Sequence, residues 1–147
     1  MMEMVIGLAS DHAGYEMKNR IIEYLNQKSI VTKDFGTVSP ESCDYADYAH
    51  QLANAIENKE LKVGLAFCGS GNGINISLNR HKDVRSAYCW KPEIAELARQ
   101  HNDANVCTVP ARFLNEDEVI EIIEVFLATG FEGGRHQKRI EKIEITN

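Results

Sequence analysis

The chain has 147 residues, of which 44% are hydrophobic and 26% charged, a composition typical of one globular domain with one hydrophobic core. Its net charge of -6 and its lack of basic runs exclude a general nucleic-acid binder, which needs a positive surface for phosphates. No window approaches the roughly 20 apolar residues of a membrane span, and no basic and apolar leader opens the chain. We therefore expect a cytoplasmic protein that binds neither nucleic acid nor membrane.

The first part of the chain alternates apolar runs with amphipathic segments. Residues 4–10 form an apolar run that ends in Asp11-His12-Ala13-Gly14, which predicts a buried strand followed by a loop. Apolar residues at helical spacing predict a helix over 15–28. The more polar segment 30–35 predicts an edge strand, and the glycine, proline and serine of 36–43 predict a loop.

The middle of the chain repeats this alternation. The spacing predicts a helix over 44–58 capped by Asp44, then a strand over 63–68. This strand runs directly into Cys68-Gly69-Ser70-Gly71-Asn72-Gly73, which we call the glycine loop, and a helix over 73–80 follows.

The last part completes the pattern. We expect strands over 84–89 and 105–109, with a helix between them that Pro92 opens in its first turn. Asn115 and Glu118 resemble a capping box at the start of a strongly apolar helix. The remaining residues, 131–147, form a charged tail that predicts one more helix.

Five strands alternating with helices predict a parallel sheet with helices on both faces, a three-layer α/β/α sandwich of the Rossmann-like type. We interpret 1–147 as a single domain whose tail, 131–147, packs on the body or on a second subunit. The sequence leaves the order of the outer strands open. Ligands of such sheets bind at the carboxyl ends of the strands where the strand order reverses, so Asp11-His12 should face the glycine loop.

The glycine loop has the character of an anion-binding site. Alternating glycines allow the backbone to approach a ligand, and the following helix offers free N–H groups. Cys68 at that helix start predicts a thiol of lowered pKa that serves as a base or nucleophile, with Ser70 donating to an oxyanion. Simpler interpretations stay open: Cys68 as an inert buried thiol, and Asp11 as a helix cap beside an exposed His12.

Basic residues cluster late in this acidic chain. Arg112 follows the fifth strand, and Arg135, His136 and Arg139 fall on one side of the tail, which suggests a phosphate clamp or else a solvated charged face. His101 ends a helix, where a histidine is often only a favourable charge. The four cysteines include no Cys-x-x-Cys pair, so neither a metal site nor a redox dithiol is expected.

Four motifs together resemble type B ribose-5-phosphate isomerases over almost the whole chain. They are Asp11-His12-Ala13-Gly14, the glycine loop, Arg99-Gln100-His101-Asn102-Asp103-Ala104-Asn105-Val106 and Glu132-Gly133-Gly134-Arg135-His136-Gln137-x-Arg139. The family includes relatives that act on allose 6-phosphate and the subunits of galactose-6-phosphate isomerase. The resemblance implies an aldose–ketose isomerase that works through a cis-enediolate, without a metal or a cofactor.

The resemblance also implies roles for individual residues. Cys68 is the base, Ser70 and the loop amides stabilise the enediolate, and His101 with Asp11 opens the sugar ring. The implied substrate-binding residues are His12, Tyr45, Gly69, Gly71, Asn72, Gly73, Asn102, Arg112, Arg135 and Arg139. The expected partners are a sugar phosphate and further copies of the chain, in a homodimer or dimer of dimers with shared sites. His101 and Arg112, on later loops, would come from the neighbouring subunit.

The chain departs from the family pattern at Ala46, where many relatives have proline, and at Trp90-Lys91. Ile74 stands where some relatives have a glutamate base, which leaves Cys68 as the candidate. These departures leave the preferred sugar open. The rival interpretations are a non-catalytic phosphosugar-binding module, a flavodoxin-like nucleotide or flavin binder and, less favoured, a thiol oxidoreductase. The joint presence of Cys68, Ser70 and His101 argues against the first.

Overall fold

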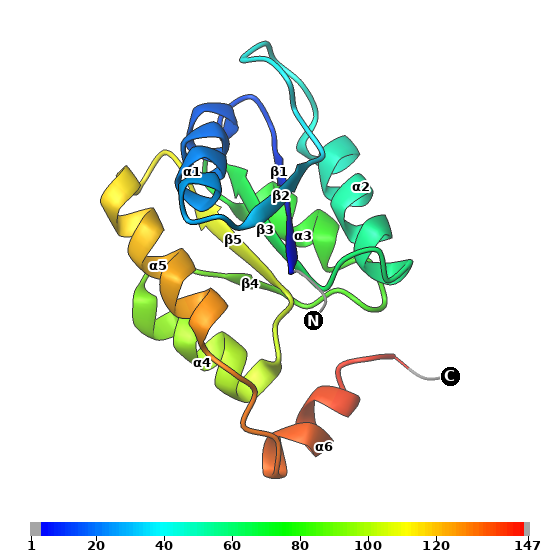
Figure 1. Ribbon diagram of the computed structural model, residues 1–147. Coiled ribbons are helices and arrows are strands. Elements are labelled where there is room, and N and C mark those ends of the chain that lie inside the picture. Colours follow the sequence, from blue (N-terminus) through cyan, green and yellow to red (C-terminus); the bar gives the residue numbers. More distant parts are fainter. Residues whose placement is uncertain (1–3, 146–147) are drawn as a thin grey trace.

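The computed structural model describes residues 4–145 and shows one parallel sheet covered by helices on both faces (Figure 1). Its strands are β1 (Val5–Ser10), β2 (Val31–Asp34), β3 (Val63–Cys68), β4 (Ser86–Tyr88) and β5 (Val106–Pro110). Its helices are α1 (Tyr15–Gln27), α2 (Tyr45–Glu57), α3 (Asn72–Leu78), α4 (Pro92–Asn102), α5 (Glu116–Ala128) and α6 (Arg135–Glu141). The predicted Rossmann-like architecture with five parallel strands is confirmed.

The strand order is β2-β1-β3-β5-β4. β2 lies at an edge, as its polar character predicts. β5 inserts between β3 and β4, so β4 forms the other edge. β4 is shorter than the predicted 84–89, because only three of these residues pair with β5. After β1 the chain forms β2 on one side of β1 and then crosses over to form β3 on its other side. The strand order therefore reverses between β1 and β3, which makes this the switch point.

Alternate side chains of the strands enter two apolar layers. Leu8 packs with Ile21 of α1 and Phe126 of α5 in a cluster that also includes α4. Ala9, the next residue, points to the other face, where it joins Leu52 of α2 in a cluster that also includes α3. Because successive strand residues alternate in direction, both faces of β1 are buried, and its apolar run has no polar interruption.

Two predicted helix starts are confirmed, whereas the helix predicted over 73–80 is α3, Asn72–Leu78. Pro92 lies in the first turn of α4, and the Asn115–Glu118 capping box opens α5. Asp44 occupies the N-cap position of α2, but its side chain makes no capping hydrogen bond, so that part of the prediction is wrong. The tail contains α6, whereas residues 146–147 of the predicted tail lie outside the described residues. Across residues 4–145, no helix combines the length and apolar character needed to cross a membrane.

Candidate active site

The loops after β1 and β3 meet at the switch point. The N–H of Asp11 donates to the carbonyl oxygen of Phe67 at 3.3 Å. Gly14 allows the first loop to pack closely against the end of β3, because a Cβ atom at this position would lie only 2.3 Å from the Phe67 oxygen. The predicted meeting of the two segments is therefore confirmed for Asp11, whose charge also acts on Cys68, and it depends on a glycine at position 14.

Asp11 and His12 are oriented by backbone N–H groups. The buried Asp11 carboxylate accepts from the N–H of Gly14 at 3.1 Å. The Nδ1 of His12 accepts from the N–H of Cys43 at 3.2 Å. A backbone N–H can only donate, so Nδ1 carries no proton in this arrangement and the ring presents its N–H at Nε2. His12 can thus donate a hydrogen bond to an anion.

Cys68 ends β3 and is 4% exposed. Burial raises the pKa of its thiol above the ordinary value, and the Asp11 carboxylate raises it further. The N–H groups of Gly71, Gly73 and Ile74 lower the pKa in part. The predicted lowering of the Cys68 pKa is therefore wrong, because burial outweighs the helix N-terminus. A thiolate of high pKa is scarce at neutral pH but is a strong base once formed.

Two predicted ligand-binding side chains lie over the glycine loop. A Cβ atom on Gly69 would lie 3.1 Å from Cδ of Arg112, and one on Gly73 would lie 2.4 Å from Cζ of Tyr45. The N–H of Arg112 also donates to the carbonyl oxygen of Gly69 at 3.0 Å. Arg112 therefore lies beside Cys68 of its own chain, which corrects the expectation that it reaches the site from a neighbouring subunit.

Ser70 and Asn72 lie on either side of Gly71, the N-cap of the helix after the loop. The Ser70 Oγ accepts from the N–H of Asn72 at 3.2 Å. Since the hydroxyl acts as an acceptor there, its own proton remains available to donate to an oxyanion. Asn72 is the first residue of α3, and Gly71 is its N-cap.

The other predicted site residues lie at the opposite end of the sheet, where the strands begin. His101 and Asn102 end α4, which starts beyond the carboxyl end of β4 and returns to the amino end of β5. The Asn102 carbonyl accepts from Nε of Arg85, the residue before β4, at 2.9 Å. A five-residue strand such as β5 spans about 16 Å, so His101 does not reach Cys68 of the same chain. Arg135 and Arg139 belong to α6, which packs against α4.

His101 lies in a small polar cluster with Glu132 and His136. The two imidazole rings stack with centroids 4.2 Å apart and planes at 14°. The Glu132 Oε1 lies 3.6 Å from Nε2 of His101 and 3.5 Å from Nε2 of His136. Burial and the charges of His101, Arg135 and Arg139 lower the pKa of His136. We call these five residues the α4–α6 cluster.

Three side chains of the α4–α6 cluster lie close enough together to hold a metal ion. One ligand atom from each of His101, Glu132 and His136 lies within 4.8 Å of the others. The two adjacent arginines oppose a cation, and the same positive charges favour an anion. The arrangement therefore fits a phosphate better than a metal ion.

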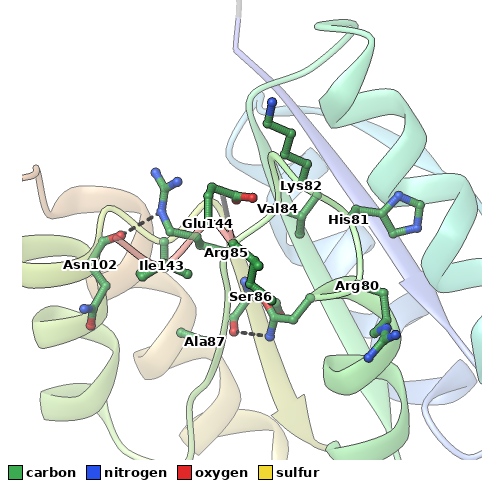
Figure 2. Close-up of a pocket in the computed structure, with 13 residues that line it drawn as sticks. Arg80, His81, Lys82, Val84, Arg85, Ser86, Ala87, Asn102, Ile143 and Glu144 are labelled. Carbon is green, nitrogen blue, oxygen red and sulfur yellow. Dashed lines mark hydrogen bonds between the residues drawn. The ribbon is translucent and has the colours of Figure 1, made fainter. Parts of the chain in front are cut away.

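A pocket of about 690 Å³ lies between the end of α3, the start of β4 and the chain after α6. Figure 2 shows Ile143 and Glu144 of the tail at one side of it, with Arg85 and Asn102 nearby. Its lining includes neither Cys68 nor the glycine loop. This pocket thus lies at the amino ends of the strands, the same end of the sheet as Asn102.

Three residues near the Cys68 site or in the α4–α6 cluster were not predicted from the sequence. Tyr88 donates to the glycine loop through its hydroxyl, at 2.8 Å from the carbonyl oxygen of Ser70. Cys43 contacts His12 through its backbone N–H, and Glu132 lies between His101 and His136. No pattern in the sequence identifies Tyr88, because its place depends on the order of the outer strands. A backbone contact such as that of Cys43 leaves no side-chain signature.

The fold and the site define an α/β protein of the Rossmann-like class with a buried thiol, a buried carboxylate and the glycine loop at its switch point. A family model described as Ribose/Galactose Isomerase matches residues 6–143. The chain belongs to this family and is therefore an aldose–ketose isomerase.

Relatives agree with this placement over nearly their whole length. The chain is 45% identical to a putative sugar phosphate isomerase of Rickettsia bellii, covering 95% of this chain and 96% of the relative. It is 38% identical to ribose-5-phosphate isomerase B of Escherichia coli, with coverage of 94% and 93%. The structure of ribose-5-phosphate isomerase B of Mycoplasma genitalium with bound ribulose-5-phosphate matches with a TM-score of 0.91 and 39% identity, over 97% of this chain and 95% of that chain.

Proposed function

We propose that this protein interconverts ribose 5-phosphate and ribulose 5-phosphate, with Cys68 as the base that transfers the proton. The observation that carries the proposal is the buried Cys68 thiol at the switch point, beside Asp11 and the N–H groups of the glycine loop. The named activity of the Escherichia coli relative and the ligand of the Mycoplasma genitalium structure support ribose 5-phosphate as the substrate.

The reaction needs one base and a site for negative charge. The Cys68 thiolate takes the proton from C2 of the open-chain aldose, and the C1 carbonyl becomes the oxyanion of a cis-enediolate. The thiol then returns its proton to C1, while the C2 hydroxyl proton moves to the oxygen on C1 and C2 becomes the ketose carbonyl. The Ser70 hydroxyl and the loop N–H groups stabilise the intermediate oxyanion.

Each active site combines two copies of the chain in a homodimer. One copy supplies the Cys68 side of the site, with His12 and Arg112 on the phosphate. The partner supplies the α4–α6 cluster, in which His101 acts with Asp11 of the first copy in ring opening and Arg135 and Arg139 bind the phosphate. The two groups lie at opposite ends of one sheet, at the carboxyl and the amino ends of its strands. This separation supports the arrangement, since two-fold symmetry completes both sites at once.

Exposed apolar side chains support an interface of this kind. Ile76 of α3 is 64% exposed, and Ile143 and Ile145 near the pocket of Figure 2 are 53% and 90% exposed. Exposed apolar side chains such as Ile143 and Ile145, which line one pocket, mark contact regions when they group on a surface. In this proposal residues 1–147 act as one domain whose tail contacts the partner.

The first test is turnover of the purified protein on ribose 5-phosphate, allose 6-phosphate and galactose 6-phosphate, each with and without EDTA. We expect turnover of ribose 5-phosphate that EDTA does not reduce. Trp90, 46% exposed after β4 with Nζ of Lys91 5.3 Å from its ring, is the departure that could redirect the preference to a hexose. Binding of all three sugars without turnover would instead support a phosphosugar-binding module, and flavin absorbance of the protein would support a flavin binder.

Replacing Arg112 by alanine should raise KM for the sugar phosphate by about 10- to 100-fold, the effect of losing a charge-assisted hydrogen bond to phosphate. The turnover number should change much less, because the base and the loop N–H groups remain. Arg112→Lys should be intermediate. Arg20→Ala is the matched control, since Arg20 lies on α1 in an exposed pair with Glu116. An unchanged KM in Arg112→Ala would remove Arg112 from the phosphate site.

A further inference from the structure

Tyr88 contacts the glycine loop from the end of the edge strand β4. β4 pairs with β5, and Tyr88 lies opposite Thr108. From there its hydroxyl donates to the carbonyl oxygen of Ser70 at 2.8 Å. The ring packs on Gly71, where an added Cβ atom would lie 2.7 Å from Cε1 of Tyr88. Tyr88 therefore contacts the loop through both its ring and its hydroxyl.

The hydrogen bond of Tyr88 fixes one particular peptide unit. The carbonyl of Ser70 and the N–H of Gly71 belong to the same planar trans peptide, so they point in opposite directions. Gly71 has φ +82°, a conformation that glycine adopts easily and from which the peptide can also rotate easily. A bond to the carbonyl on one side therefore fixes the direction of the N–H on the other side.

This peptide also acts on the Cys68 thiol. The N–H of Gly71 is one of three loop N–H groups that lower the pKa of the Cys68 thiol, with those of Gly73 and Ile74. The N–H groups of Gly73 and Ile74 belong to α3, whose helical geometry holds them. Gly71 is the N-cap, outside the helix, so its N–H needs another restraint.

We propose that Tyr88 is a positioning residue, whose hydroxyl holds the Ser70–Gly71 peptide so that the Gly71 N–H faces the Cys68 sulfur. Its effect on turnover rests on the proposed function, whereas its effect on the thiol does not. In the proposed mechanism the same N–H group also donates to the enediolate oxygen, so one contact serves both the base and the intermediate.

The ionisation of Tyr88 itself suits this role. Burial raises the pKa of Tyr88 above the ordinary value, and the negative charge of the nearby Cys68 thiolate raises it further. Both effects favour the protonated hydroxyl, the form that donates to the Ser70 carbonyl. The other titratable or charged groups around the loop are Asp11 after β1, Tyr45 of α2 and Arg112 after β5.

The test replaces Tyr88 by phenylalanine, which keeps the ring on Gly71 and removes the hydroxyl. The alkylation rate of Cys68 by iodoacetamide is measured against pH, with the modified peptides separated by mass spectrometry so that Cys43 does not interfere. We expect the midpoint to move up by about half to one pH unit, the size of one hydrogen-bond contribution. Tyr24→Phe is the matched control, because the hydroxyl of Tyr24 on α1 bonds to Glu124 on α5, outside the glycine loop. An unmoved midpoint in Tyr88→Phe would overturn the proposal.

Two further measurements complete the test. In the unaltered protein, the amide resonance of Gly71 should shift as Cys68 titrates, and a resonance that stays fixed would overturn the proposal even if Tyr88→Phe does not fold. The acid limb of kcat/KM for ribose 5-phosphate should move in the same direction as the alkylation midpoint, with KM unchanged. If the protein has no isomerase activity, the alkylation midpoint and the Gly71 resonance still decide the role of Tyr88.

Discussion

Replacing Cys68 by alanine should lower the turnover number by about 10²- to 10⁴-fold, because the variant has no group to move the proton between C1 and C2. Cys68→Ser should be similarly inactive, since a serine hydroxyl at this buried position is a far weaker acid and remains protonated. In both variants the proposed phosphate-binding residues are intact. Ribose 5-phosphate should therefore still bind, which titration calorimetry measures directly.

The matched control for this prediction is Cys107→Ala. Cys107 is a buried thiol of β5 in the apolar core, and its loss should cost about 1 to 2 kcal/mol of stability while turnover persists. Turnover of Cys68→Ala at the normal rate would remove Cys68 as the base. The pH dependence gives a further check: because burial raises the thiol pKa and the thiolate is the active form, kcat/KM should rise with pH and level off only in the alkaline range.

Mixing two inactive variants should restore activity if each site uses both copies of the chain. Cys68→Ala and His101→Ala should each be severely impaired as homodimers. A heterodimer of the two contains one site with Cys68 from one copy and His101 from the other, and one site with neither. Random pairing puts half of the chains in heterodimers, so the mixture should reach about a quarter of the unaltered activity.

The measurement is turnover after the two variants are unfolded and refolded together, with heterodimers counted by native mass spectrometry through a mass tag on one variant. Refolding each variant separately before mixing is the control and should give no recovery until subunits exchange. Heterodimers without activity would show that His101 does not complete the site of its partner. A double variant carrying both changes should give no recovery with either single variant.

Local patterns determine much of this fold. The apolar runs that became β1 and β3 are buried on both faces, and the capping box at Asn115–Glu118 forms as predicted. The hydrogen-bonding and conformational preferences that produce these features involve residues close in the chain. The position of Asp11 beside Cys68 also follows from the sequence, because the first and third strands of such a sheet end together at the switch point.

The sequence by itself therefore determined the parallel sheet, its two helical layers and the meeting of the loops after β1 and β3. Tertiary structure alone decided that β5 lies between β3 and β4. This order brings Arg112 and Tyr88 to the glycine loop and leaves His101 at the opposite end of the strands. It also decided that the Cys68 pKa is raised, since burial depends on packing between distant segments. Local periodicity specifies which residues are apolar, but strand order and burial arise from pairings between residues far apart in the chain.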